Sequence, residues 1–172
     1  NVSTGTTIAT ASASDPESQA ITYSLSGTGS GNFAVDSAGN ITLAAGLDYE
    51  TATSYSLTLS ASDGVNTTNN TLTITIDDVN EAPSLSNSLA ASSFAENIAT
   101  GTTIASASAS DPESQTITYS LSGTGSDKFA VDSAGNITLS SALDYETATS
   151  YSLTLTASDG TNSTSNTINV SV

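Results

Sequence analysis

The stretch Tyr55-Ser56-Leu57-Thr58-Leu59-Ser60-Ala61-Ser62 decides the fold, because apolar and hydroxyl side chains alternate strictly along it. A period of two places every apolar side chain on one face of an extended chain, whereas a helix would scatter them around its surface. The stretch therefore predicts a β-strand with one buried face and one solvated face. The same alternation in 21–25 and 71–76 predicts further strands of this kind.

This strand recurs 96 residues later, from Tyr151 to Ser158, within a match between residues 1–76 and 97–172 that contains no insertion. Such a period is too long for a solenoid repeat and fits one small domain per period. We expect two domains, 1–80 and 81–172, with a linker at 77–83. The first copy has no counterpart of residues 81–96, so we expect it to lack its N-terminal strand and the chain to be a segment of a longer protein. A strand of a neighbouring repeat or of another molecule, or local fraying, is expected to fill the gap in the core of the first copy.

The expected fold class is all-β, with tandem seven-stranded Greek-key β-sandwiches of the immunoglobulin-like kind. Asp36-Ser37-Ala38-Gly39-Asn40 predicts a hairpin turn with its glycine in the left-handed conformation. Ile8 is out of phase with Ala11, which predicts a β-bulge or a shallowly buried strand. The strands expected in the second copy lie near 84–95, 102–109, 116–122, 128–131, 136–140, 150–158 and 165–172.

The composition is strongly acidic, with 17 Asp or Glu residues against one Lys or Arg and a formal net charge of -16. Nucleic acids and anionic membranes bind basic patches, so this balance excludes both as direct partners. The chain has no Cys and no His, which excludes disulfides and removes the usual ligands of zinc, copper and iron. Oxygen ligands remain, and these are the ligands that calcium prefers.

Oxygen-bearing side chains are concentrated at the joint between the copies. Its sequence is Ile76-Asp77-Asp78-Val79-Asn80-Glu81-Ala82-Pro83. In a sandwich with alternating strand directions, successive loops alternate between the two ends of the domain. Like charges about 5 Å apart cost about 3 kcal/mol per pair at an effective dielectric constant of about 20. If the domains stack head to tail, divalent counter-ions are therefore expected at the joint. The acids that would converge there are Asp48, Glu50, Asp78, Glu81, Asp111, Glu113 and Asp159.

Five motifs, in this order and at domain spacing, together resemble the calcium motifs of cadherin repeats. They are Leu47-Asp48-Tyr49-Glu50, Asp78-Val79-Asn80-Glu81-Ala82-Pro83, Ala95-Glu96-Asn97, Asp111-Pro112-Glu113 and Ala157-Ser158-Asp159-Gly160. The resemblance covers essentially the whole chain and implies the cadherin fold with Ca²⁺ between consecutive repeats. It implies as interdomain ligands Asp48, Glu50, Asp78, Asn80, Glu81, Asp111, Glu113 and Asp159, with the carbonyl of Val79. It implies as half-sites for neighbouring repeats Asp15, Glu17, Asp63, Glu96, Asp144 and Glu146.

The chain departs from the animal cadherin pattern in two places. The linker is one residue shorter, and the second acid of the Asp111-Pro112-Glu113 motif is Glu where that pattern has Asp. The near-identical copies, rich in Ser, Thr and Ala, look like the cadherin-like repeats of large bacterial surface adhesins. The resemblance thus implies an extracellular or cell-surface stalk that is stiffened by calcium, with neighbouring repeats of the same protein as partners.

Two other classes of function compete with the calcium-stiffened stalk. A homophilic or carbohydrate-binding adhesion module is the alternative, although the chain has no Trp for sugar stacking. A glycosidase with paired carboxylates is the enzymatic hypothesis. It is disfavoured because the acids lie at the ends of the domains and the chain offers no His, Arg or Cys to support them.

Overall fold

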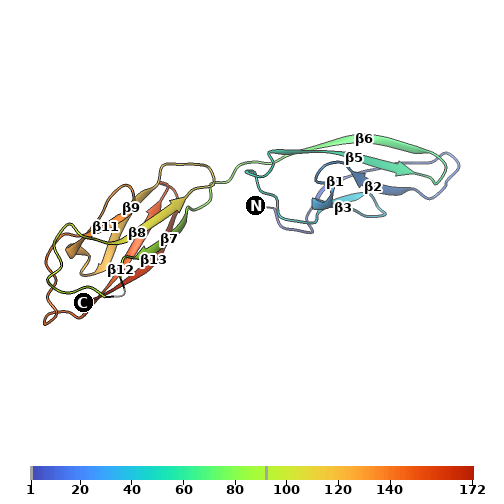
Figure 1. Cartoon of the computed structure of the whole chain (residues 1–172). Coiled ribbons are helices and arrows are strands. Elements are labelled where there is room, and N and C mark those ends of the chain that lie inside the picture. The colour runs from blue at the N-terminus through green and yellow to red at the C-terminus, as the bar shows by residue number, and fades with distance from the viewer. Residues whose placement is uncertain (1, 92) are drawn as a thin grey trace. The chain divides into compact units, whose positions relative to one another are not determined.

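The computed structural model describes residues 2–91 and 93–172 of the chain and is built almost entirely of strands. Its internal contacts divide it into two compact units, unit 1 (Asn1–Val79) and unit 2 (Asn80–Val172). Figure 1 labels most of the strands, among them β5 and β6 of unit 1 and β12 and β13 of unit 2. Within the described residues, no helix has the length and apolarity that a membrane span would need.

Unit 2 is a complete β-sandwich, as the sequence predicted. One sheet has the strand order β10-β11-β8-β7 and the other β13-β12-β9, and all the strand pairs are antiparallel. A 3-10 turn, Ser126–Lys128, leads into β10. The strands of the described part of unit 2 are β7 (Ser84–Leu89), β8 (Thr103–Ser110), β9 (Thr118–Thr124), β10 (Phe129–Val131), β11 (Asn136–Leu139), β12 (Ser150–Ser158) and β13 (Ser163–Ser171).

Unit 1 repeats this plan without the first strand. Its sheets have the orders β1-β4-β3 and β2-β5-β6, which correspond to β8-β11-β10 and β9-β12-β13 of unit 2. Its described residues hold no counterpart of β7, so the expectation that the first copy lacks its N-terminal strand is confirmed. The strands are β1 (Thr7–Thr10), β2 (Thr22–Ser26), β3 (Phe33–Val35), β4 (Asn40–Leu43), β5 (Ser54–Ser62) and β6 (Thr67–Thr75), and the 3-10 turn before β3 is Ser30–Asn32.

The first strand of unit 2 is shorter than predicted. We expected it to run near 84–95, but β7 ends at Leu89. The Ala90 amide still donates to Ile104 O of β8 at 2.7 Å, whereas the Phe94 amide donates to Ser171 O of β13 at 2.9 Å. The chain has therefore crossed from one sheet to the other by Phe94. Ser92, inside the predicted range, lies outside the described residues.

The predicted hairpin turns and the predicted bulge are both present. Gly39 has a φ of 83°, which confirms the left-handed glycine of the predicted turn, and Gly135 at the matching position of unit 2 has a φ of 84°. The Oδ1 of Asp36 accepts hydrogen bonds from the amides of Ala38 and Asn40, both at 2.9 Å. The register between β1 and β4 shifts between Thr7 and Ala9, so the bulge expected near Ile8 is confirmed.

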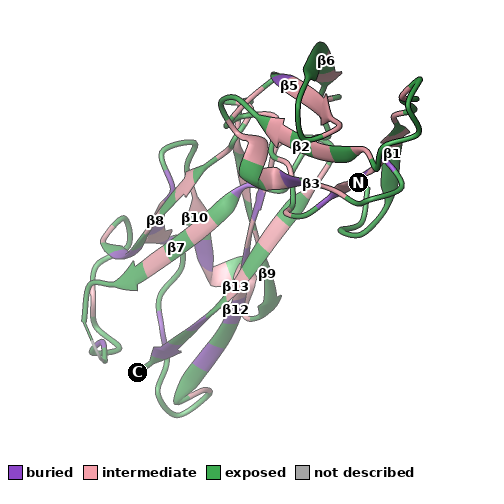
Figure 2. Ribbon diagram, turned by 90° about the vertical axis from the view of Figure 1, so that its right-hand side faces the viewer, coloured by how far each residue is buried: buried purple, intermediate pink, exposed green. Residues whose placement is uncertain are grey.

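Alternation along the strands builds the core of unit 2. Leu153, Leu155 and Ala157 of β12 are fully buried, whereas Thr154 and Thr156 between them are only half-buried. Figure 2 shows buried segments along β12 and β13. Phe94 packs into the same core. The buried core of unit 1 is smaller and is centred on Phe33, Leu43, Tyr55 and Leu57.

The hydroxyl of the core tyrosine has a hydrogen-bond partner in unit 1 but not in unit 2, within the described residues. In unit 1 the Asn32 side chain donates to Tyr55 Oη at 3.2 Å. The matching Tyr151 Oη is buried and has no hydrogen-bond partner among the described residues, because Lys128 replaces the asparagine and donates instead to Ala142 O. The ring contacts are alike, with centroids 5.3 Å apart for Phe33 and Tyr55 and 5.5 Å apart for their counterparts.

Lys128→Asn is therefore expected to raise the free energy of unfolding of unit 2 by about 0.5–1.5 kcal/mol, since it supplies the donor that Tyr151 lacks. Urea unfolding followed by circular dichroism measures the change. As the matched control, Asn32→Ser should lower the stability of unit 1 by a similar amount. A Lys128→Asn variant no more stable than the parent would contradict the prediction.

Candidate calcium-binding site

The loop Asp111–Gln115 between β8 and β9 holds two carboxylates in a fixed position. The Ser114 amide donates to Asp111 O at 3.1 Å, and the Gln115 amide donates to Asp111 Oδ1 at 2.9 Å. Ser114 adopts a φ of 59°, a left-handed conformation that is costly for a residue with a side chain. The loop therefore adopts a strained backbone conformation at Ser114, and one oxygen of Asp111 is held in place by the Gln115 amide.

The second oxygens of this loop are left without protein donors. Asp111 Oδ2 and Glu113 Oε1 are both buried, and neither has a hydrogen-bond partner in the described part of the chain. The other oxygen of Glu113, Oε2, accepts from the Glu81 amide at 3.4 Å. Burying an ionised carboxylate oxygen without a donor or a counter-charge is costly. These two atoms therefore have the environment of cation ligands.

Asn80, the first residue of unit 2, is bonded to two neighbouring loops of that unit. Its Nδ2 donates to Asp159 Oδ2 at 2.8 Å, and its carbonyl accepts from Asn162 Nδ2, also at 2.8 Å. Gln115 Nε2 donates to Asn80 Oδ1. Asn80 is thereby held between the β8–β9 loop and the β12–β13 turn, beside the acids of both.

Asp159 caps the turn between β12 and β13. Its Oδ1 accepts from the amides of Thr161 and Asn162, each at 2.6 Å. Burial alone would raise the pKa of the Asp159 carboxyl, but the hydrogen bonds from Asn162, Asn80 and Thr161 outweigh it and hold the pKa below its ordinary value. The carboxyl is therefore ionised at neutral pH and able to bind a cation.

A second group of acids lies at the opposite end of the strands of unit 2. Glu96, Asp144 and Glu146 offer carboxylate oxygens within 4.8 Å of one another, and all three are exposed. The Tyr145 amide donates to Glu96 Oε2 at 2.9 Å. The Thr147 hydroxyl donates to Asp144 Oδ2 at 2.6 Å and is the main cause of the lowered pKa of Asp144, which burial opposes. Three of the predicted half-site residues are thus gathered at one point.

Unit 1 has the same loop at the corresponding end. The Glu50 amide donates to Asp48 Oδ1 at 3.0 Å, and the Thr51 hydroxyl donates to Asp48 Oδ2 at 2.7 Å. The Thr51 bond is the main cause of the lowered pKa of Asp48. Glu50 and Asp78 offer carboxylate oxygens within 4.8 Å of each other. Val79, the last residue of unit 1, has a half-exposed side chain and could contribute only its carbonyl.

The other predicted half-site residues are not gathered in this way. Asp15 accepts from the Gln19 amide at 2.9 Å, and Asp63 accepts from the amides of Val65 and Asn66. Among the residues that the structure describes, Asp15, Glu17 and Asp63 belong to no group of three acids with oxygens within 4.8 Å of one another. Within the described part of the chain, Asp111 and Asp159 belong to no such group of three acids either.

Sequence reasoning missed two residues of the site, Gln115 and Asn162, which hold Asn80 in place. Both recur in the first copy, as Gln19 and Asn66, and that recurrence was an available signal. The roles differ between the copies. In unit 1 the Asn66 side chain donates to its own turn acid, Asp63 Oδ2, at 3.3 Å, whereas Asn162 reaches the carbonyl of Asn80.

Comparisons with known proteins identify the family of the chain. The model of the Cadherin domain matches residues 1–77 and 91–172. Protocadherin Fat 4 of Mus musculus is 36% identical over 168 residues, which are 90% of this chain and 3% of that protein. The Drosophila melanogaster protocadherin-like wing polarity protein stan is 37% identical over 175 residues, which are 92% of this chain and 5% of that protein. The chain therefore spans only a small part of these relatives.

Solved structures show the same fold. Drosophila N-cadherin EC1-4 has a TM-score of 0.63 and 29% identity, and the match covers 99% of this chain and 45% of that one. Protocadherin gammaB7 EC3-6, described as a cis-dimer structure, has a TM-score of 0.63 and 26% identity, with 99% and 43% covered. Cadherin domains are extracellular, non-enzymatic modules of adhesion proteins, as the sequence predicted for this chain. The matched model spans nearly all of both copies, and the chain belongs to the cadherin domain family.

Proposed function

We propose that the two repeats, residues 1–80 and 81–172, bind calcium at their joint and form a calcium-stiffened segment of the stalk of a cell-surface adhesin. The partners in this role are the neighbouring repeats of the same protein. The proposed interdomain ligands are Asp48, Glu50, Asp78, the Val79 carbonyl, Asn80, Glu81, Asp111, Glu113 and Asp159. Glu96, Asp144, Glu146, Asp15, Glu17 and Asp63 are proposed as half-sites for adjoining repeats.

The observation that carries the proposal is the pair of buried oxygens Asp111 Oδ2 and Glu113 Oε1, which lack a donor among the described residues. Folding removes both from water without giving them a partner, which an ionised carboxylate tolerates only beside a counter-charge. The chain has a single basic residue, Lys128, and its ammonium group donates elsewhere, to Ala142 O. A bound cation would supply the charge.

The donor set favours calcium over other metals. Every candidate ligand is an oxygen, from a carboxylate, an amide or a backbone carbonyl, and calcium accepts six to eight such ligands in an adaptable geometry. Zinc, copper and iron favour nitrogen or sulfur ligands, and the chain has neither His nor Cys. Magnesium retains several waters and demands a stricter octahedron.

Asn80 supports the stiffening role. It is bonded through its side chain and its carbonyl to both acid-bearing loops of unit 2, so the joint enters unit 2 in a fixed conformation. Pro83 has a fixed φ and also restrains Ala82, the residue before it, to an extended conformation. A cation bound by Asp111, Glu113 and the joint residues would extend this restraint towards unit 1.

The two copies also present the same acidic loop. Asp48 and Asp144 are each held by a threonine hydroxyl three residues later and by the amide of the following glutamate. Repetition of this loop at the same place in both units supports a role that recurs at every joint of a longer array. The bacterial adhesin context suggested by the composition remains a prediction.

Calcium titration of the Asp111→Asn variant tests the proposal. We expect the parent chain to bind Ca²⁺ with a Kd of about 0.1–1 mM, the range of extracellular modules. Asp111→Asn, which removes one charge and keeps the shape, should weaken binding by about tenfold or more. Isothermal titration calorimetry measures both.

The matched control is Asp127→Asn, which removes the same charge from an exposed acid of unit 2 outside the proposed ligands. It should leave the Kd within about twofold of that of the parent, because screening reduces the effect of distant exposed charges. A parent chain that does not bind calcium, or an equal loss in both variants, would refute the joint as the metal site. The homophilic or carbohydrate-binding module would then become the leading hypothesis.

A further inference from the structure

The side-chain amide of Asn80 is hydrogen-bonded at both of its ends within unit 2. Its Nδ2 donates to Asp159 Oδ2 at 2.8 Å, and its Oδ1 accepts from Gln115 Nε2. Because an ionised carboxylate can only accept, the nitrogen of this amide faces Asp159 and the oxygen faces Gln115. The three side chains therefore form a chain of hydrogen bonds that runs from Gln115 through Asn80 to Asp159.

The proposed calcium ligands of unit 2 are thus of two kinds. Asp111 Oδ2 and Glu113 Oε1 are buried and have no donor among the described residues. Asn80 Oδ1 and Asp159 Oδ2, in contrast, each accept a hydrogen bond from a side-chain amide. An amide N–H and a cation both direct positive charge at the oxygen that they share, so they repel each other there. A cation that uses Asn80 Oδ1 is therefore opposed by the Gln115 amide.

Gln115 is placed by its backbone and held by a single side-chain bond. Its backbone amide donates to Asp111 Oδ1 at 2.9 Å, which fixes the residue beside the acids. Its side chain is exposed, and within the described part of the chain its one hydrogen bond is to Asn80. An exposed glutamine gives up rotamer freedom for this neutral bond, and the loss and the gain are of similar size. The bond is therefore weak enough for a cation to replace.

The position of Gln115 is also one where charge would matter. The affinity of a calcium site rises with the number of charged ligands. The loop already presents Asp111 and Glu113, and an amide two residues after Glu113 satisfies Asn80 without adding a negative charge. A carboxylate at position 115 would instead offer a further oxygen to the cation.

We propose that Gln115 sets the calcium affinity of the joint by competing with the cation for Asn80 Oδ1. In the calcium-free chain the Gln115 N–H stands on that oxygen in place of the cation, and the Gln115 side chain leaves Asn80 when calcium binds. This inference rests on the proposed calcium site and adds to it the residue that keeps its affinity low.

A competing role and a purely structural role predict opposite effects of Gln115→Ala. If Gln115 only positioned Asn80, its loss would weaken calcium binding. If Gln115 competes with calcium, its loss should tighten binding about two- to tenfold, the strength of one neutral hydrogen bond. Gln115→Glu replaces the competing donor by a charged acceptor and should tighten binding by about tenfold or more.

Isothermal titration of the full chain with calcium measures these changes. Ser122→Glu is the matched control, because it adds the same charge as Gln115→Glu at an exposed position of β9, outside the proposed site. It should leave the Kd within about twofold of that of the parent, since screening weakens the effect of a distant exposed charge.

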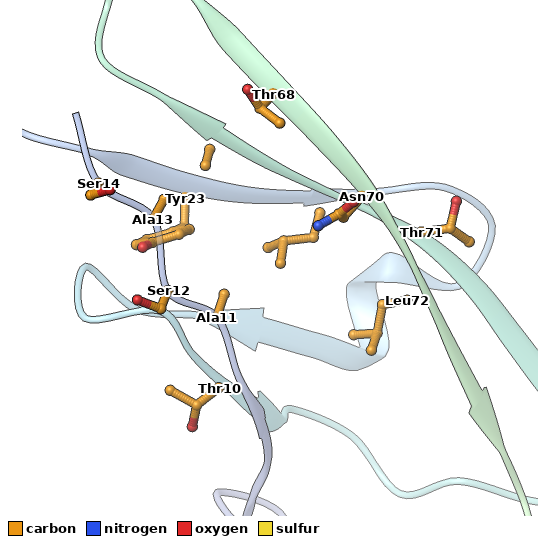
Figure 3. A pocket seen from close by; sticks show the side chains of 12 residues that line it. Thr10, Ala11, Ser12, Ala13, Ser14, Tyr23, Thr68, Asn70, Thr71 and Leu72 are labelled. Carbon is orange, nitrogen blue, oxygen red and sulfur yellow. The ribbon is translucent and has the colours of Figure 1, made fainter. Parts of the chain in front are cut away.

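Side-chain amide NMR of the parent chain observes the contact without any substitution. The chain has only two glutamines, Gln19 and Gln115, and the Gln19 side chain has no hydrogen-bond partner among the described residues. In a chelator, the Gln115 signal should differ from that of Gln19, and saturating calcium should move it towards the Gln19 position. Asn70, which Figure 3 shows in a pocket lined by uncharged side chains, supplies a reference signal that should not move.

Two results would overturn this inference and leave the calcium site standing. One is a Gln115→Ala variant that binds calcium as the parent does or more weakly. The other is a Gln115 side-chain signal that stays in place while the parent becomes saturated with calcium. A parent chain that binds no calcium would instead refute the proposed function, and this inference with it.

Discussion

Gly135→Ala is expected to destabilise unit 2 by about 3–4 kcal/mol, the sum of a conformational and a steric cost. Gly135 has a φ of 84°, which an L-residue adopts at a cost of about 1–2 kcal/mol. A Cβ at this position would lie 2.6 Å from Ala107 O of β8. That strand cannot easily retreat, because the Ala107 amide is bonded to Gly135 O at 2.9 Å.

The Gly101→Ala variant separates the conformational cost from the steric cost. Gly101 has nearly the same φ, 85°, but a Cβ there would meet no atom within 4 Å. It should therefore cost only about 1–2 kcal/mol, the conformational part alone. Hydrogen exchange of the β12 amides reports the stability of unit 2 by itself. Equal losses in the two variants would show that close contact with β8 contributes nothing.

The strands could be predicted from the sequence because their signal is local. Alternation in 55–62 and 150–158 fixes which face is buried, and β12 has the predicted bounds of Ser150–Ser158. The end of β7 could not be predicted in the same way. It depends on Phe94 entering the core and bonding to Ser171 of β13, a partner more than seventy residues away in sequence.

In the candidate site, too, the features that are local in sequence could be predicted and those that depend on the fold could not. Asp111, Glu113 and Asp159 were identified because carboxylates at loop positions are visible in the sequence. Gln115 and Asn162 were missed because their role depends on where Asn80 lies. The two unpaired oxygens of Asp111 and Glu113 could not have been predicted either, since burial and hydrogen bonding are properties of the folded loop.

Calcium is expected to stabilise the chain strongly. At a concentration of about ten times the Kd, each bound ion adds about 1.4 kcal/mol to the free energy of unfolding. Two ions at the joint would add about 3 kcal/mol, which corresponds to a rise of roughly 10–20 °C in the Tm of a unit of this size. The rise should be lost when Asp111 and Asp159 are replaced, because both acids are proposed ligands. Differential scanning calorimetry measures it.

The control for that experiment exists within the chain. Asp15→Ala/Asp63→Ala replaces the counterparts of the two acids in unit 1, which cap the same turns but are not proposed ligands of this joint. It removes the same charge and the same caps as Asp111→Ala/Asp159→Ala. The Tm of each variant is compared with and without calcium. Loss of the turn caps lowers both values equally, so the difference between them reports only the response to the metal.

The most direct test of the calcium-stiffened joint is therefore the Tm of the parent chain and of both double variants, each measured in a chelator and at calcium concentrations well above the Kd. We predict a large calcium-dependent rise for the parent and for Asp15→Ala/Asp63→Ala, and little or none for Asp111→Ala/Asp159→Ala. An unchanged Tm of the parent on adding calcium, or an undiminished rise in Asp111→Ala/Asp159→Ala, would contradict it.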